Sequence, residues 1–189
     1  MHKIMAELHL DHVHLTKVFN LLDQQAQLIG TGGSNKAKAD IFLMVDIAHY
    51  MKSYPDLIHH PKEDRVYNVF KARTNDGADI VAQVQNEHQL LPNETIKLYT
   101  LLEAAANSVL LISREKLQSK IQNFLAIERK HMDLEEEILF PLIESTLTEE
   151  DWNSIDIATL SKSDPLFGAN IEACYENLYQ SIKSQGEID

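Results

Sequence analysis

Apolar residues along this chain recur at steps of three and four positions, the spacing that places side chains on one face of an α-helix. The breaks in the pattern coincide with residues that end or cap helices, such as the glycines of 30–33, Gly77 and Ser113. The pattern predicts four long helices, from the N-terminus to about 29, over roughly 37–73, from beyond 77 to about 107, and from 113 to 141 or a little further. We therefore expect an all-α fold, an antiparallel up-down-up-down four-helix bundle.

Short helices are predicted after the bundle, packed on its outside. Thr148 and Asp151 resemble a capping box, the signature of a helix start. Asp164 followed by Pro165 is typical of an N-cap and first helical residue, so a last helix is expected from there to about Lys183.

Prolines lie inside two of the predicted long helices. Pro55 and Pro61 fall in the second helix, and Pro92 falls in the third. A proline within a helix removes a backbone hydrogen bond and usually kinks the chain. We expect bends at these positions.

Composition and charge narrow the function classes. The 189 residues are expected to form a single domain over 1–189, with the bundle over about 1–145 and a helical annex over about 148–185. A formal charge of −12 argues against binding nucleic acid phosphates. The one cysteine, Cys174, suits a reducing compartment. Since neither a signal peptide nor a run of ~20 apolar residues is present, we expect a cytoplasmic protein without a membrane partner.

Histidines interrupt the apolar face of every predicted long helix. On the second and fourth helices a glutamate follows the histidine by four positions, so imidazole and carboxylate share a face one turn apart. The histidines of the third and fourth helices lie at the same distance from the intervening turn, which predicts equal depth in the bundle. The residues expected to converge are His12, His59, Glu63, His88, His131 and Glu135.

Such a set of imidazoles and carboxylates predicts a dinuclear metal site. Burying these ionisable groups without a metal would be strongly unfavourable through desolvation and mutual repulsion. Imidazole and carboxylate together suit iron, manganese or zinc, and the lack of cysteine ligands argues against a zinc–thiolate site. The remaining histidines receive other interpretations: a hydrogen-bonded core residue for His49, and surface residues for His2, His9 and His14.

Longer segments surround the six candidate ligands: Asp11-His12, residues 54–64 (YPDLIHHPKED), Glu87-His88, residues 131–141 (HMDLEEEILFP) and residues 163–168 (SDPLFG). Together they resemble the hemerythrin-like HHE cation-binding family, the last segment being similar to a feature of its bacterial members. The resemblance spans nearly the whole chain. It implies a four-helix bundle around a non-haem di-iron centre.

Carried over to this sequence, the resemblance assigns roles to the six residues. It makes His12, His59, His88 and His131 terminal ligands, and Glu63 and Glu135 bridges between two iron ions. The positive charge of two divalent ions exceeds the negative charge of the two carboxylates. The site can therefore also hold a bridging oxo or hydroxo group or another small anion. Manganese or zinc would suit the same ligands. Glu136 offers an alternative carboxylate, but the spacing of His59 and Glu63 favours Glu135.

The chain departs from the oxygen-carrying hemerythrins on the third helix. The third helix of those proteins carries a His-x-x-x-His motif. In this chain the position four after His88 is Pro92, which cannot bind a metal. One coordination position is then open or water-filled unless His60 fills it. An open position favours redox reactivity over reversible oxygen storage.

The expected function is that of a di-iron protein that reacts with or senses dioxygen, nitric oxide or peroxide, or handles iron under oxidative or nitrosative stress. Its expected partner is a small diatomic or anionic, azide-like ligand. One alternative is a module that stores or senses oxygen or iron without catalysis. Another is a ferritin-like carboxylate oxidase, suggested by Glu128-x-x-His131 and Asp56-x-x-His59, which would need inward glutamates where the first and third helices carry histidines.

Overall fold

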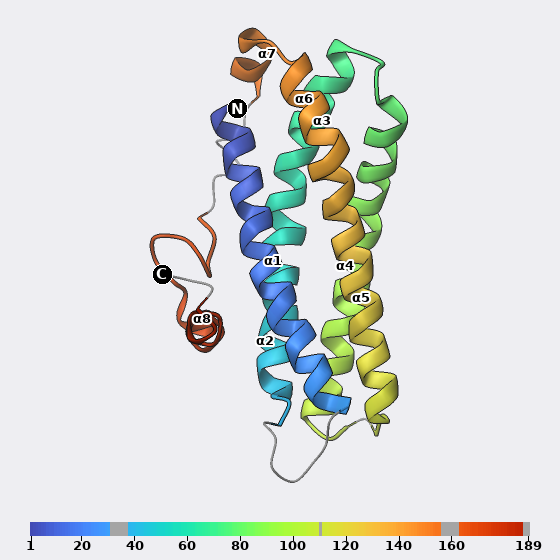
Figure 1. The fold of residues 1–189 in the computed structure, drawn as a ribbon, viewed down its shortest axis with the longest axis vertical. Coiled ribbons are helices and arrows are strands. Elements are labelled where there is room, and N and C mark those ends of the chain that lie inside the picture. Colours follow the sequence, from blue (N-terminus) through green and yellow to red (C-terminus); the bar gives the residue numbers. More distant parts are fainter. Residues whose placement is uncertain (31–37, 110, 156–162, 187–189) are drawn as a thin grey trace.

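Four antiparallel helical rods form the body of the protein (Figure 1). The structure is a computed structural model that describes residues 1–30, 38–109, 111–155 and 163–186. The rods are α1 (Lys3–Gly30); α2 (Ile41–Ser53) with η1 (Pro55–His59) and α3 (His60–Arg73); α4 (Ala78–Ala106); and α5 (Arg114–Leu134) with η2 (Glu135–Leu139) and α6 (Phe140–Thr146). No strand occurs in these described ranges. The predicted all-α bundle is confirmed.

The helix boundaries agree with the prediction at most ends. The second rod begins at Ile41 rather than near residue 37, because the Asp40 side chain accepts hydrogen bonds from the backbone N–H groups of Phe42 and Leu43 at 3.0 and 3.1 Å. The third rod continues through Pro92 as one helix.

Two turns of π-helix, η1 and η2, interrupt the second and fourth rods. In each, the residue after the turn donates its backbone N–H to the carbonyl five positions back. Pro61 and Pro141 come next; a proline has no N–H, and in an α-helix its ring clashes with the carbonyl four residues earlier. The bend expected near Pro61 therefore takes the form of a wider turn. These two turns carry His59 and Glu135.

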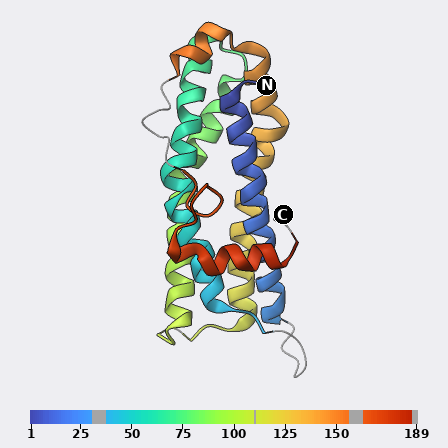
Figure 2. The same ribbon diagram turned by 90° about the vertical axis from the view of Figure 1, so that its left-hand side faces the viewer.

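Among the described residues after the bundle, the helices are α7 (Glu149–Ser154), η4 (Ala173–Tyr175) and α8 (Glu176–Ser184). The predicted capping box of Thr148 and Asp151 opens α7. Figure 2 shows α8 crossing the outside of α1 and α2, as expected for an annex packed on the bundle.

The predicted start of the last helix at Asp164 is wrong. Asp164 caps a single turn, accepting hydrogen bonds from the backbone N–H groups of Leu166 and Phe167 at 2.8 and 3.0 Å. Gly168 closes this turn by donating to the Asp164 carbonyl at 2.8 Å, and a Cβ at Gly168 would collide with that carbonyl. The chain therefore turns back, and α8 begins only at Glu176.

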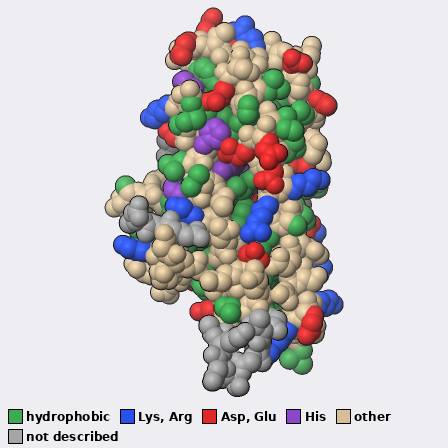
Figure 3. Space-filling view, viewed as in Figure 1, with side chains coloured by type: hydrophobic (Ala, Val, Ile, Leu, Met, Phe, Trp, Pro, Cys, Tyr) green, Lys and Arg blue, Asp and Glu red, His purple; other side chains and the backbone are tan. Residues whose placement is uncertain are grey.

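The surface carries charges of both signs. Figure 3 shows acidic and basic side chains scattered over one face, with histidine side chains reaching the surface in its upper half. Within the described ranges, no helix has the length and apolar character needed to span a membrane.

Candidate metal centre

A polar layer divides the interior of the bundle into two apolar clusters. On α1, the residues from Ile4 to Leu8 belong to one cluster and those from Leu15 onward to the other. The same division occurs on the other three rods. The layer between the clusters contains the six residues expected to converge, all of them at most 7% exposed: His12, His59, Glu63, His88, His131 and Glu135.

Glu63 lies in the middle of this layer and is fully buried. One of its carboxylate oxygens, Oε1, is 3.3 Å from Nε2 of His12 and 3.2 Å from Nε2 of His59. The other, Oε2, is 3.4 Å from Nε2 of His88. The carboxylate thus faces imidazoles on opposite sides of the bundle, as a bridging ligand would.

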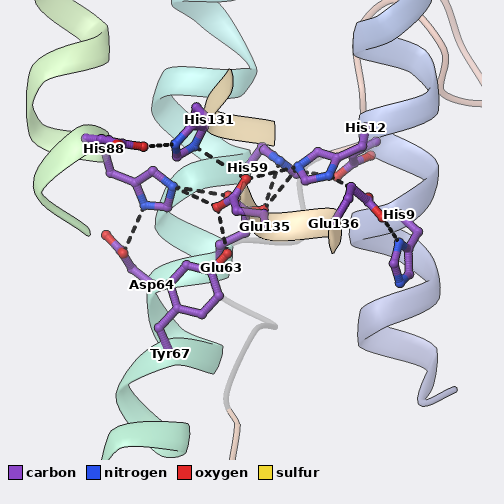
Figure 4. Close-up of polar contacts among 12 residues, drawn as sticks. His9, His12, His59, Glu63, Asp64, Tyr67, His88, His131, Glu135 and Glu136 are labelled. Carbon is purple, nitrogen blue, oxygen red and sulfur yellow. Dashed lines mark hydrogen bonds and ion pairs between the residues drawn. The ribbon is translucent and has the colours of Figure 1, made fainter. Parts of the chain in front are cut away.

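Glu135, also fully buried, lies beside it and likewise contacts imidazoles through both of its oxygens. Its Oε2 is 3.5 Å from Nε2 of His12 and 3.4 Å from Nε2 of His131, and its Oε1 is 3.3 Å from Nε2 of His88. The hydroxyl of Tyr67 donates a hydrogen bond to Oε1 at 2.7 Å. Figure 4 shows His12 on α1 and His88 on α4 approaching the two glutamates from opposite sides.

Each of the four imidazoles uses its other nitrogen, Nδ1, to contact a carboxylate outside the central pair (Figure 4). The four pairs are His12–Glu136 at 2.7 Å, His59–Asp11 at 3.1 Å, His88–Asp64 at 3.0 Å and His131–Glu87 at 2.8 Å. A carboxylate at Nδ1 fixes the tautomer and the ring orientation and leaves the Nε2 lone pair for a metal.

These four pairs form a closed ring around the bundle. Each supporting carboxylate lies next in sequence to a central residue of its own rod. It contacts the imidazole of the following rod, and the carboxylate of the fourth rod contacts the imidazole of the first. Asp11 on α1, for example, supports His59 on η1, while Glu136 on η2 supports His12 on α1. The four rods are therefore held in register by the same groups that orient the imidazoles.

The pKa values describe the site without a metal. Burial lowers the pKa of His12, but the hydrogen bond to Glu136, the close contact with Glu63 and the charges of Glu63 and Glu135 raise it to about 10. Burial also lowers the pKa of His88, but Asp64, Glu135 and Glu63 raise it to about 10. The pKa of Glu63 lies well below its usual value despite burial, chiefly because of His59. Metal binding must therefore displace protons from this layer.

Several central atoms have no hydrogen-bond partner although they are buried, which is rare for polar groups in proteins. They are Nε2 of His12, His88 and His131, both carboxylate oxygens of Glu63, and Oε2 of Glu135. Two atoms bound to one ion at ~2.1 Å lie roughly 3.0–3.4 Å apart at angles of about 90–110°. The observed separations of 3.2–3.5 Å match that spacing. The residues therefore fit a metal centre.

His60 enters the same layer. It is 4% exposed, its ring stacks on that of His88 with centroids 4.6 Å apart, and one of its nitrogens lies within 4.8 Å of nitrogens of His88 and His131. Burial, together with His88, holds its pKa well below the usual value, so the ring is neutral and free to bind a metal. The side with His88 and His131 thus has a third imidazole available.

Other residues singled out in the sequence lie outside the centre. Glu128 and Asp56, on which the ferritin-like alternative depends, join none of the ligand groups found within 4.8 Å among the described residues. Burial raises the pKa of Glu128 well above its usual value, and Asp56 adds to the effect. His49 is partly buried and not in the core as expected, but its ring does form the expected hydrogen bond, with the Tyr175 hydroxyl at 2.9 Å.

The three histidines expected on the surface, His2, His9 and His14, are partly buried instead, and two of them have contacts that bear on the site. His9 contacts Glu136 at 2.7 Å and packs edge-on against Phe140, so it extends the network that supports His12. His14 stacks on Phe167, 4.2 Å away, because the turn after Asp164 folds back onto α1. Neither contact follows from helix periodicity, since both partners come from distant parts of the chain.

The sequence did not reveal that these four carboxylates support the imidazoles, although Glu136 was considered as an alternative bridge, and it gave no role to Tyr67. A signal was present: Asp11, Asp64, Glu87 and Glu136 each stand next to a central histidine or glutamate. A short acidic side chain beside an inward ligand lies at the edge of the same helix face, within reach of the neighbouring helix.

Comparison with known proteins agrees with this geometry. The family model described as the hemerythrin HHE cation-binding domain matches residues 3–143, which contain all six central residues and the four supporting carboxylates. No curated protein and no solved structure matches the chain significantly. On the family match, which covers about three quarters of its length, the chain belongs to the hemerythrin HHE cation-binding family.

Proposed function

We propose that the chain is a dinuclear non-haem iron protein. The observation that carries the proposal is the central pair of fully buried glutamates, Glu63 and Glu135, whose oxygens face imidazoles on both sides. Membership of a cation-binding family supports the binding of at least one ion. The proposal of two ions rests on the two glutamates, each of which has imidazoles on both sides.

The ligands divide into two groups that share these bridges. His12, His59 and Glu63 place ligand atoms within 4.8 Å of one another, as do Glu63, His88 and Glu135. One ion would be held by His12 and His59, and the other by His88 and His131 with His60. Since the bridges serve both ions, the His12 side has one imidazole fewer and is the side where an external ligand binds.

The protein's own groups prepare the site for redox use. Iron bound there would supply one-electron chemistry and a position for a small ligand. The ring of carboxylates orients the imidazoles, and Tyr67 holds Glu135 through its hydroxyl. Phe140 stacks on His12 with centroids 5.2 Å apart, and the two apolar clusters exclude water on either side. The function best supported is reaction with, or sensing of, dioxygen, nitric oxide or peroxide, including iron handling under oxidative or nitrosative stress.

A second candidate is reversible storage or sensing of oxygen without catalysis. The position of His60 favours it, because this imidazole replaces the one that Pro92 removes from the third helix. The two candidates differ in what happens to dioxygen after binding.

Oxygen consumption by the reduced, iron-loaded protein tests the proposal. For a reactive centre, we expect dioxygen to be consumed and not recovered on degassing, with continued uptake when a reductant is supplied. Recovery of all dioxygen on degassing would favour storage. No change in absorbance or oxygen content would contradict both. The His60→Ala variant, compared with His49→Ala as control, shows whether the third imidazole determines the outcome.

A further inference from the structure

A second group of potential metal ligands lies where the annex meets the bundle. Asp11 and His14 on α1 and Asp164 in the turn of residues 163–168 each place one ligand atom within 4.8 Å of the other two. Both carboxylates are 8% exposed, and the side chain of His14 is 17% exposed. The sequence brings these residues together only through the turn of 163–168, which packs Phe167 on the His14 ring.

The two carboxylates are held in place by hydrogen bonds that leave room for an ion. Asp164 accepts the backbone N–H groups of its own turn through Oδ1 and the Tyr50 hydroxyl through Oδ2, the latter at 3.0 Å. Asp11 accepts the Tyr54 hydroxyl at 3.3 Å and supports His59 at 3.1 Å. A carboxylate has about four lone-pair sites, so neither group is saturated.

The imidazole of His14 supplies the decisive observation. Its Nδ1 is shielded from solvent and has no hydrogen-bond partner. The nearest carboxylate oxygen, Oδ2 of Asp164, is 3.9 Å away, too far for a hydrogen bond. Two ligands of one ion at ~2.1 Å can be separated by up to about 4.2 Å. The spacing therefore suits an ion between the two groups rather than direct contact.

The types of ligand point the same way. Two carboxylates, each 8% exposed, and an imidazole whose Nδ1 lacks a hydrogen-bond partner form a compact group of oxygen and nitrogen ligands. Divalent transition-metal ions accept this combination of ligands.

We propose that Asp11, His14 and Asp164 form a separate site for one divalent cation that accepts nitrogen and oxygen ligands, such as manganese, iron or zinc. The ion joins the turn of the annex to α1. Asp11 would then bind this ion and also hold the His59 ring through its contact with Nδ1. The site shares no ligand with the dinuclear centre, so this inference does not depend on the proposed function.

A manganese titration of the metal-free protein tests the inference, with the electron paramagnetic resonance signal of free Mn²⁺ as readout. We expect three bound ions per chain in the wild type and two in His14→Ala, while the control His2→Ala retains three. Asp164→Asn keeps an oxygen that can cap the turn but loses the charge, and it should weaken the third ion by at least about 10-fold. Circular dichroism establishes that each variant is folded.

The outcomes separate this site from the dinuclear centre. An unchanged count in His14→Ala would overturn the inference, whatever the count in the wild type. If the wild type bound one ion and His14→Ala none, the accessory site would stand and the dinuclear proposal would fail.

Discussion

Replacing Glu135 with glutamine is the most informative perturbation of the centre. The change keeps the size and shape of the side chain and an oxygen for the Tyr67 hydroxyl, which donates at 2.7 Å. It removes the negative charge that faces three imidazoles at 3.3–3.5 Å. Glu137, two positions later and exposed, provides the matched control, because Glu137→Gln makes the same chemical change outside the site.

The expected loss of stability is large. Removing one partner of a buried ion pair costs about 3–5 kcal/mol, since the other charge remains buried without compensation. With a urea dependence of about 2 kcal/mol per molar, the unfolding midpoint of metal-free Glu135→Gln should fall by roughly 1.5–2.5 M. Glu137→Gln should change the free energy of unfolding by no more than about 0.5 kcal/mol.

Urea unfolding of the metal-free proteins measures this difference, and iron analysis after dialysis measures its effect on binding. Glu135→Gln should also lose iron, because the residue would contribute to both ions. A midpoint shift below about 0.5 M together with full iron content would refute the assignment of Glu135 to the centre. Equal shifts in the two variants would show that the effect is general and not specific to the buried site.

The remaining predictions concern the surroundings of the centre. Glu87→Gln should weaken iron binding about 10–100-fold, measured by chelator competition, because His131 loses the carboxylate at Nδ1; an unchanged affinity would contradict the supporting role. Since the pKa values of His12 and His88 are raised to about 10, their stabilisation of the metal-free fold is present below about 6.5 and is lost as pH rises through about 10. Metal affinity should accordingly increase from pH 7 to 10 with proton release, measured by calorimetry in buffers of different ionisation enthalpy; an affinity independent of pH would argue against it. Glu128→Gln should retain iron, and thermal unfolding at pH 8 should show that the metal-free variant is more stable than the wild type. The raised pKa of Glu128 indicates that its buried carboxylate is unfavourable at this pH; loss of iron would instead favour the ferritin-like alternative.

Helix periodicity was sufficient to predict the bundle and the convergence of the six central residues. A three-to-four-residue apolar repeat determines which face of a helix is buried, so a histidine on that face must point inward. The pairing of His59 with Glu63 and of His131 with Glu135 follows from the same geometry.

Features that depend on contacts between rods could not be predicted in this way. The inward position of His60 accompanies the wide π-helical turn before Pro61, and helix periodicity alone would place His59 and His60 on different faces. The burial of His14 depends on a turn whose local signals, Asp164 and Pro165, equally suit a helix start. Only Gly168, where a Cβ would collide with the preceding turn, distinguishes the two.

The central claim, two iron ions bridged by Glu63 and Glu135, is tested most directly by crystallography of protein reconstituted anaerobically with ferrous iron. Anomalous difference maps at the iron absorption edge locate each ion independently of the protein model. We predict two peaks about 3.5–4 Å apart, one beside His12 and His59 and one beside His88 and His131. A single peak in the polar layer, or iron located only elsewhere in the protein, would contradict the account.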